Sequence, residues 1–351
     1  MTADSFNIEK ISSEEKDRES DQATYKINTF GTDFTLEVLS KKIDDKEIII
    51  PPFQRRFVWP HKKASKLIES FLLGLPVPQI FLYRDEKSQD LLVVDGQQRL
   101  KTINYFFNEK FEDNKLFYLQ GVHQTWEGKS YSTLSESDKR KLKNTPLRAT
   151  IFEQIDPKDN SSMFQIFERL NTGGMPLSQQ EIRTSLYHGK IVEFLRDLNK
   201  NSIWRKLIGK EAPDARMRDV ELILRFFSLY KNWQDYKPSM KDFMNDFMKK
   251  NKNLNIQVQK EWSSLFNNTI DTIYNKIGKN AFRLKKHVNV AVFDSIMITV
   301  AELKSRLSND LKNKFEKLIK ETAYINAVSQ ATTNPEQIQT RIKITKQLFK
   351  K

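Results

Sequence analysis

The sequence predicts an α+β fold, with a small mixed-sheet domain followed by an all-α helical domain. Short strand-like runs such as "PQIFLYR" (78–84) and "DLLVV" (90–94) alternate with amphipathic helical segments in the first half of the chain. After Asp159, the apolar residues recur almost entirely at helical spacing. The helices do not follow the strands regularly enough for a doubly wound sheet. No segment repeats at a fixed period, which argues against a solenoid.

The elements of the mixed-sheet domain are predicted from local signals. The run "TLEVLSKKI" (35–43) is helical, and "ASKLIESFLLG" (64–74) is an amphipathic helix closed by Gly74. The run "EIIIPPFQRRFVW" (47–59) is extended, because its two prolines exclude a helix. Two further runs are predicted as strands: "KLFYLQG" (115–121) and "LRATIFEQI" (147–155).

The helical half begins with two predicted helical segments. Met163, Ile166, Phe167 and Leu170 form one apolar stripe. In "LSQQEIRTSLYHG" (177–189), Ser178 and Glu181 have capping-box spacing, and Gly189 occupies the position of a C-cap. Further helices are predicted over residues 219–230, 241–250, 290–307 and 311–325. The predicted domains are an acidic mobile tail (1–28), a mixed-sheet domain (29–190) and a basic helical domain (191–351).

Composition excludes several classes of protein. The chain has no cysteine, which rules out disulfides, cysteine–zinc sites and thiol catalysis. No apolar run approaches the length of a membrane span, and the N-terminal residues contain no apolar signal-peptide core. We therefore expect a cytoplasmic protein with no membrane partner.

The net charge of +14 is unevenly distributed along the chain. Residues 1–30 hold seven acids and four bases, whereas residues 241–351 hold 21 bases and 10 acids. A basic helical region of this kind favours a polyanion partner such as DNA, and its many lysines suit phosphate contacts better than base reading. A lysine-rich surface that only keeps the protein soluble explains the same charge.

The turn "VVDGQQRL" joins a strand to a helix and has two readings. As structure alone, Asp95 can cap the helix, Gly96 relieves the turn, and Gln98 can complete a capping-box-like exchange. Gln97 and Arg99 remain unexplained, because a cation in the first helical turn opposes the helix dipole. Such a cation becomes favourable when an anion is bound at the same helix end. The absence of GxxxxGK[ST] excludes a Walker-type loop.

Two other stretches carry polar residues that suit a phosphate site. In "PPFQRRFVW", Gln54, Arg55 and Arg56 lie in an apolar setting, where a guanidinium needs a phosphate or carboxylate partner. In "FERLN", Glu168 and Asn171 share a helical face, and such oxygen ligands beside phosphates typically hold Mg²⁺. Aromatic packing and an ordinary helix surface, respectively, explain the same stretches without a ligand.

Together the three stretches resemble the DGQQR-motif family, which forms the N-terminal domain of GmrSD-type restriction enzymes. The resemblance is carried by "IPPFQR" (50–55) with Trp59, "VDGQQR" (94–99), and "FERLN" (167–171) leading to "PLS" (176–178) and Glu181. It extends over roughly residues 30–345 and implies a ParB/sulfiredoxin-like fold for the mixed-sheet domain.

The resemblance implies a nucleoside triphosphate site with Mg²⁺, coupled to the sensing of foreign or modified DNA in anti-phage defence. Glu168 and Asn171 match the metal-binding positions, while Asp95, Arg99 and Glu168 match the catalytic ones. Whether Asp95 orients water or caps the turn stays open. The resemblance implies nucleotide contacts for Gln54, Arg55, Gly96, Gln97, Gln98, Arg99 and Thr102.

The sequence departs from the GmrSD-type pattern in one respect. None of its four histidines lies in the His-x-x-Pro-type setting of an HNH nuclease, so we expect a stand-alone member without nuclease activity. The favoured reading is an NTP–Mg²⁺ sensor or switch that acts with DNA and a separate nuclease or ATPase effector, with slow NTP hydrolysis left open. The alternative is a non-catalytic DNA-binding or assembly module whose nucleotide pocket is vestigial.

Overall fold

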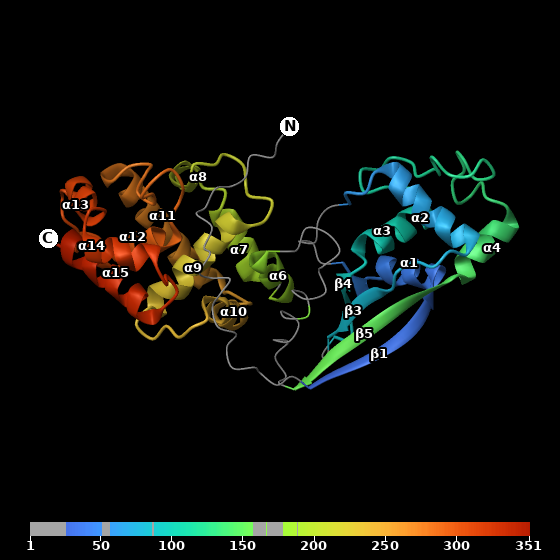
Figure 1. Cartoon of the computed structure of the whole chain (residues 1–351), viewed down its shortest axis with the longest axis horizontal. Helices are drawn as coiled ribbons and strands as arrows, with labels where there is room; N and C mark the ends of the chain where they lie inside the picture. Colours follow the sequence, from blue (N-terminus) through green and yellow to red (C-terminus); the bar gives the residue numbers. More distant parts are fainter. Residues whose placement is uncertain (1–25, 51–56, 86–87, 157–165, 167–177, 188) are drawn as a thin grey trace. The chain divides into compact units, whose positions relative to one another are not determined.

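The computed structural model confirms the α+β class. It describes residues 26–50, 57–85, 88–156, 166, 178–187 and 189–351. The chain divides into two compact units, a sheet unit (Thr24–Leu177) and a helical unit from residue 178 onward (Figure 1).

The sheet unit contains a five-stranded mixed sheet with the order β1-β5-β3-β4-β2. Its strands are β1 (Lys26–Thr35), β2 (Ile48–Ile49), β3 (Ile80–Arg84), β4 (Leu91–Asp95) and β5 (Pro146–Asp156). The pairs β1–β5 and β3–β4 are antiparallel, whereas β3–β5 and β2–β4 are parallel. The predicted strands at 78–84, 90–94 and 147–155 are confirmed.

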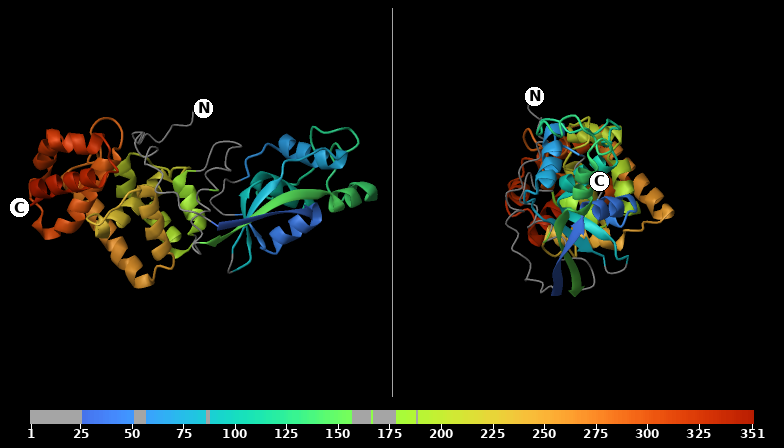
Figure 2. Two further views of the ribbon diagram at one scale, coloured as in Figure 1. Left: turned by 60° about the horizontal axis from the view of Figure 1, so that its bottom comes forward. Right: turned by 90° about the vertical axis from the view of Figure 1, so that its right-hand side faces the viewer.

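Strand β1 was not predicted, and its first residues fall in the expected tail. It pairs along its whole length with β5, for example Phe30 with Ile151, and the two long strands run side by side in both views of Figure 2. Its side chains are mostly exposed, so it has little apolar alternation to reveal it. Pairing with β5, which is distant in sequence, stabilises the extended conformation of this segment, and no local sequence pattern predicts it.

The run 115–121, predicted as a strand, forms a single bridge from Leu116 to Lys110. Its alternation is real, because Phe117 and Leu119 are buried while Leu116 and Tyr118 are exposed. The backbone of Leu119 bonds to a following loop at Lys129 instead of a neighbouring strand. The alternation of apolar residues in this run therefore predicted correctly which side chains are buried, but it predicted a strand that is not formed.

The described residues of the sheet unit also form four named helices. They are α1 (Leu36–Asp44), α2 (His61–Leu73), α3 (Gln97–Phe107) and α4 (Glu136–Asn144). Helix α2 ends at Gly74 in the left-handed conformation, as predicted. Helix α3 packs against α1 and α2, and its Leu100, Ile103 and Phe106 are fully buried in the core of this unit.

The helical unit consists of consecutive helices packed around one core. They are α6 (Gln179–Leu186), α7 (Lys190–Leu198), α8 (Ser202–Ile208), α9 (Arg218–Asn232), α10 (Met240–Lys250), α11 (Ile256–Lys276), α12 (Val290–Leu303), α13 (Leu311–Leu318), α14 (Thr322–Ser329) and α15 (Pro335–Phe349). The predicted segment 311–325 is therefore two helices. Among the described residues, no helix is both long enough and apolar enough to cross a bilayer.

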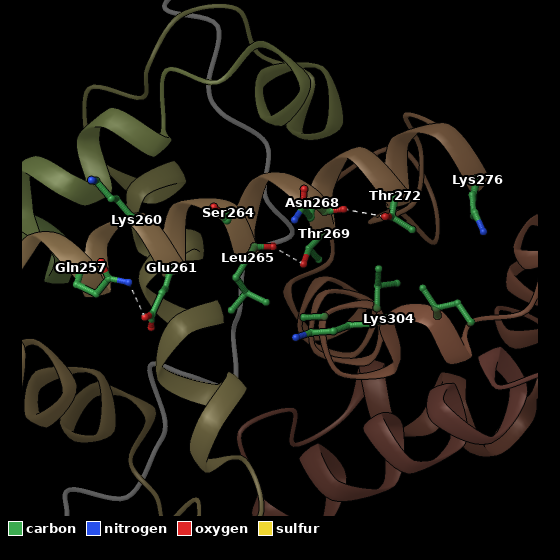
Figure 3. A pocket seen from close by; sticks show the side chains of 13 residues that line it. Gln257, Lys260, Glu261, Ser264, Leu265, Asn268, Thr269, Thr272, Lys276 and Lys304 are labelled. Atoms are coloured by element: carbon green, nitrogen blue, oxygen red, sulfur yellow. Dashed lines mark hydrogen bonds between the residues drawn. The ribbon is translucent and has the colours of Figure 1, made fainter.

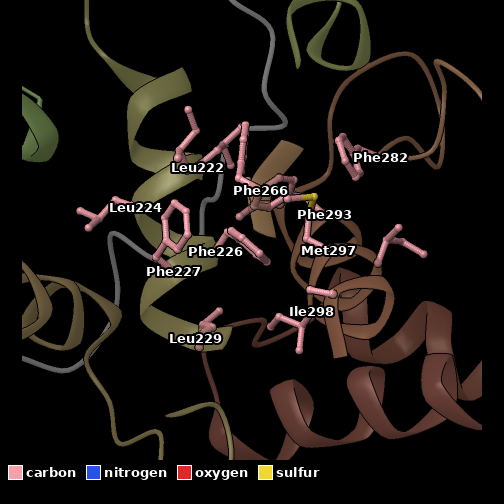
Figure 4. Close-up of a cluster of buried hydrophobic side chains, with 14 of the residues drawn as sticks. Leu222, Leu224, Phe226, Phe227, Leu229, Phe266, Phe282, Phe293, Met297 and Ile298 are labelled. Carbon is pink, nitrogen blue, oxygen red and sulfur yellow. The ribbon is translucent and has the colours of Figure 1, made fainter. Parts of the chain in front are cut away.

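Helix α12 is the centre of this core. Every residue of α12 except Glu302 is buried, which matches its apolar composition on all faces. Figure 4 shows Phe293, Met297 and Ile298 of α12 near aromatic side chains of α9 and α11. Asp294 of α12 is a fully buried carboxylate, and it accepts hydrogen bonds from Arg225 of α9 and Arg341 of α15.

The boundary between the units lies between residues 177 and 178, earlier than the residue-190 boundary drawn from sequence. Helix α6 packs on α9 and α10, and therefore belongs to the helical unit. The capping box of Ser178 and Glu181 is present as predicted. The predicted C-cap at Gly189 is wrong, because this residue is the N-cap of α7.

Candidate functional site

The candidate site lies where β4 ends and α3 begins. Asp95 is the last residue of β4, and Gly96, with φ 98° and ψ 7°, is the N-cap of α3. Among the described residues no side-chain cap is present at this helix end, so the purely structural reading, in which Asp95 is the N-cap with a Gln98 exchange, is wrong. The chain needs a left-handed residue to turn from strand into helix, and that geometry puts the glycine in the capping position.

Gly96 is required for two reasons. Its positive φ is strained for any residue with a side chain. A Cβ atom at this position would lie 2.5 Å from Cγ2 of Ile80 and 3.3 Å from Nη2 of Arg99. The missing side chain thus lets β3, β4 and the first turn of α3 close on one another.

Arg99 is paired with Asp95 across one helical turn. Its Nη2 donates to Oδ2 of Asp95 at 2.8 Å. The arginine side chain is 14% exposed and the aspartate side chain 39% exposed. Within the described part of the chain, Asp95 is the one carboxylate in contact with this guanidinium. The arginine is held in place while its partner remains open to solvent.

Gln98 joins two of the predicted motifs. Its Oε1 accepts from the backbone N–H groups of Val58 and Trp59 at 3.0 and 3.3 Å. These two residues belong to the "PPFQRRFVW" run, and its last two residues are thus fastened to the first turn of α3. The Gln98 side-chain oxygen therefore has a positioning role, which spacing alone did not reveal.

Thr102 has a structural role in α3. Its side chain is fully buried, and its hydroxyl donates to the Gln98 carbonyl at 2.7 Å. A hydroxyl in this position is satisfied by its own helix and is not presented to a ligand. Of the predicted nucleotide contacts that the structure describes, Gly96, Gln97, Gln98 and Arg99 come together in the turn, whereas Thr102 does not join them.

A family comparison places this turn inside a known domain. Residues 36–188 match the family described as "GmrSD restriction endonuclease, N-terminal domain". The chain carries a GmrSD-type N-terminal domain. No curated protein matches the chain. Within the GmrSD-type domain lie β2 to β5 and the whole "DGQQR" turn, while β1 precedes the matched residues.

Glu112 is a part of the GmrSD-type domain that the sequence did not single out. Its Oε2 accepts from the Phe57 backbone N–H at 3.5 Å, Tyr105 Oη at 3.2 Å and Lys101 Nζ at 3.3 Å. Burial opposes the charge on Glu112, but the Lys101 ammonium and these hydrogen bonds outweigh it and lower the carboxyl pKa. Burial and the Glu112 carboxylate raise the pKa of Tyr105 far above its ordinary value.

Glu112 therefore accepts from the backbone of residue 57, just as Gln98 accepts from the backbone of residues 58 and 59. Next to them, Lys63 Nζ lies 4.7 Å from the ring centroid of the half-buried Trp59. Glu112 is one of three acids in the polar run "NEKFEDNK", and nothing in that run marks it out, because its contact with Phe57 joins segments that are distant in sequence.

The remaining predicted site residues of the GmrSD-type domain lie outside the described residues: Gln54, Arg55, Glu168 and Asn171. Their predicted roles at a phosphate and at Mg²⁺ stay predictions. Among the residues that the structure describes, no three histidine, aspartate or glutamate side chains gather as metal ligands. A glutamate and an asparagine supply the oxygen atoms that Mg²⁺ prefers, so the chemistry of the predicted pair fits this ion.

Proposed function

We propose that the GmrSD-type domain binds a nucleoside triphosphate with Mg²⁺ at the start of α3. In this proposal the protein is a sensor or switch in restriction-type anti-phage defence, and it acts with DNA and a separate effector. The defence role is drawn from the matched family, described as a restriction endonuclease domain. The nucleotide site is drawn from the geometry of the "DGQQR" turn.

The arrangement of Arg99 carries the proposal. A cation in the first turn of a helix opposes the helix dipole, so its position needs a compensating anion. Asp95 supplies one carboxylate, but among the described residues this one hydrogen bond leaves most of the five guanidinium donors for another partner. A phosphate at this helix end can bind backbone N–H groups and the guanidinium together.

The positioning contacts support the same proposal. Gln98 and Glu112 fasten residues 57–59 to α3, and in this proposal Gln54 and Arg55 contact the same phosphate as Arg99. Glu168 and Asn171 would hold the Mg²⁺ ion, which neutralises phosphate charge when bound. Catalysis, where it occurs, is electrostatic: Arg99 and Arg55 stabilise charge on the transferred phosphoryl group without a covalent step.

The test is the substitution Arg99→Ala, measured by calorimetric titration with each of the common nucleoside triphosphates and Mg²⁺. We expect nucleotide binding to be lost, because the main phosphate partner is removed. The free energy of unfolding should change by only about 1 kcal/mol or less, since the Asp95–Arg99 pair is partly exposed. A large loss of stability in the ligand-free protein would mean that the turn is purely structural.

Arg218→Ala is the matched control, because Arg218 also pairs with an aspartate four residues earlier, in the helical unit. This variant should bind nucleotide as the wild type does. If neither protein binds any nucleotide, and if DNA retention is unaffected by nucleotide and Mg²⁺, the alternative of a DNA-binding or assembly module with a vestigial pocket replaces the proposal.

A further inference from the structure

A hollow of about 600 Å³ in the helical unit is lined by five cations. It lies among the end of α8, the loop between α11 and α12, and α13. The cations are Lys206, Lys279, Arg283, Lys285 and Lys286, and no carboxylate lines the hollow. We infer that this basic hollow binds the phosphate backbone of a nucleic acid.

The charge in the basic hollow is not neutralised locally. Within the part of the chain that the structure describes, none of the five cations forms an ion pair with a carboxylate. The sequence from residue 272 to 293 contains no aspartate or glutamate. Lys206, Lys279, Lys285 and Lys286 are all exposed. Like charges gathered in this way repel one another until a polyanion binds them.

Arg283 fixes the shape of the basic hollow. Its Nη1 donates to the Leu207 carbonyl at 2.9 Å and to the Lys279 carbonyl at 2.6 Å, which ties the loop to the end of α8. Burial lowers the pKa of this guanidinium. Gly209 (φ 73°) leaves room for it, because a Cβ there would lie 2.6 Å from Arg283 Nη2. Arg283 is thus a positioning residue for the loop that carries three lysines.

A second hollow in the same unit provides a contrast. It lies between α11 and α12, has a volume of about 760 Å³ and also contains three lysines (Figure 3). Glu261 lines it and accepts from Gln257, and Thr269 and Thr272 donate to carbonyls of their own helix. Its carboxylate opposes an anion and its hydroxyls are satisfied. The basic hollow is the better phosphate site.

The chemistry of the basic hollow favours a nucleic-acid backbone over a lipid surface. None of the large exposed hydrophobic side chains of the described residues lines it, and a membrane-surface site needs such side chains to enter the lipid. Lysines bind phosphates as point charges and read little sequence. The choice of DNA as the biological partner rests on the proposed function, but phosphate binding in the basic hollow does not depend on nucleotide.

The test compares the full-length protein with the triple variant Lys279→Glu, Lys285→Glu, Lys286→Glu. Binding to labelled duplex DNA, single-stranded DNA and RNA is measured by fluorescence anisotropy over a range of salt concentrations, without nucleotide. We expect the variant to bind at least about tenfold more weakly, with the slope of log K against log salt flattened by about 3. Comparison of the three probes then identifies the preferred nucleic acid.

A control variant, Lys250→Glu, Lys260→Glu, Lys343→Glu, makes the same change in net charge at exposed positions outside the basic hollow. It should keep most of the wild-type affinity. Equal losses in both variants, no loss in either, or tighter binding to anionic vesicles than to any nucleic acid would overturn the inference. If the glutamate variant fails to fold, as judged by thermal melting, glutamine replacements at the same three positions give the same comparison.

Nucleotide titration of the hollow variant separates this inference from the proposed function. We expect the variant to bind nucleotide normally while losing nucleic acid. A protein that loses nucleic acid in this variant but never binds nucleotide would support the basic hollow and reject the nucleotide site.

Discussion

Asp95–Arg99 and Asp214–Arg218 are aspartate–arginine pairs with the same spacing, each beside the start of a helix and one in each unit. In the first, the arginine side chain is 14% exposed and the aspartate 39%. In the second, the exposures are reversed, at 37% for the arginine and 7% for the aspartate. Asp214 accepts from the Arg218 backbone N–H and from both Nε and Nη2 of its guanidinium.

The comparison separates a structural pair from a candidate binding pair. The Asp214 carboxylate accepts three hydrogen bonds from Arg218, the first residue of α9, and a further one from the Arg216 backbone, and an acid at the start of a helix is favourable. Arg99 is held by one bond at the first turn of α3, and its carboxylate partner faces solvent. The same four-residue spacing therefore has two different roles. The burial of each side chain decides which member of the pair is accessible to solvent or to a ligand.

The Asp294 triad is the fully buried extreme. Asp294 and Arg341 are completely buried and Arg225 nearly so. The arginines reach this carboxylate at 2.8 and 2.6 Å. Such a group sets the relative positions of α9, α12 and α15, because its charges are satisfied only in one arrangement.

The largest expected effect is that of Asp294→Ala. Removing the carboxylate leaves two arginines buried without a counter-charge, so we expect the free energy of unfolding to fall by about 3–5 kcal/mol. Urea denaturation followed by circular dichroism measures this loss. A combined replacement of Asp294, Arg225 and Arg341 by leucine or methionine should recover most of it. A loss of about 1 kcal/mol or less for Asp294→Ala alone would show that the triad does not hold the core.

The next effect compares two left-handed glycines of the sheet unit. A Cβ at Gly74 meets no atom within 4 Å, so Gly74→Ala should cost only the conformational strain, about 1–2 kcal/mol. Gly96→Ala adds the clash with Ile80 and should cost about 2–4 kcal/mol. Thermal melting measures both variants. Equal costs would mean that β3 and α3 shift easily, and would weaken the case for a preorganised turn at Arg99.

The smallest effect is a difference in acid stability. Burial alone raises the pKa of Asp214, but the hydrogen bond and charge of Arg218 lower it by more. A lowered pKa in the folded state stabilises the protein above the ordinary aspartate pKa, and that contribution is lost as the pH falls through the folded value. Asp214→Asn should cost about 1–2 kcal/mol near neutral pH and should flatten the decline in stability below about pH 4.

Calorimetric melting from neutral to acidic pH, with Asp95→Asn as the comparator, measures this difference. At neutral pH the Asp95 variant should lose about 1 kcal/mol or less, because its carboxylate is exposed and accepts one guanidinium bond. An Asp95 variant less stable than the Asp214 variant would reverse the comparison on which the proposed site depends.

Local sequence signals predicted the elements whose own residues decide them. Nearly every residue of helix α12 is buried, and helix α2 ends at Gly74. Ser178 and Glu181 form the capping box at the start of helix α6. Each of these depends on contacts within a few residues, or on burial that composition alone reveals. Strands β3, β4 and β5 were predicted for the same reason.

Features made by distant partners were not predicted. Strand β1 exists because β5 pairs with it, and residues 115–121 alternate without a strand beside them. In the candidate site, the sequence did not predict that the Gln98 side-chain oxygen accepts from the backbone of Val58 and Trp59. Glu112 joins the same assembly with no signal of its own.

The sequence by itself determined the α+β class, the order of most elements, the basic helical half and the position of the strand-to-helix turn at "DGQQR". Only the tertiary structure decided that Gly96 rather than Asp95 is the N-cap residue of α3, and that Arg99 rather than Asp95 is the more buried member of its pair. It also decided which lysines share one hollow. The physical reason is that spacing reports on neighbours along one element, whereas burial and charge pairing depend on segments that only folding brings together.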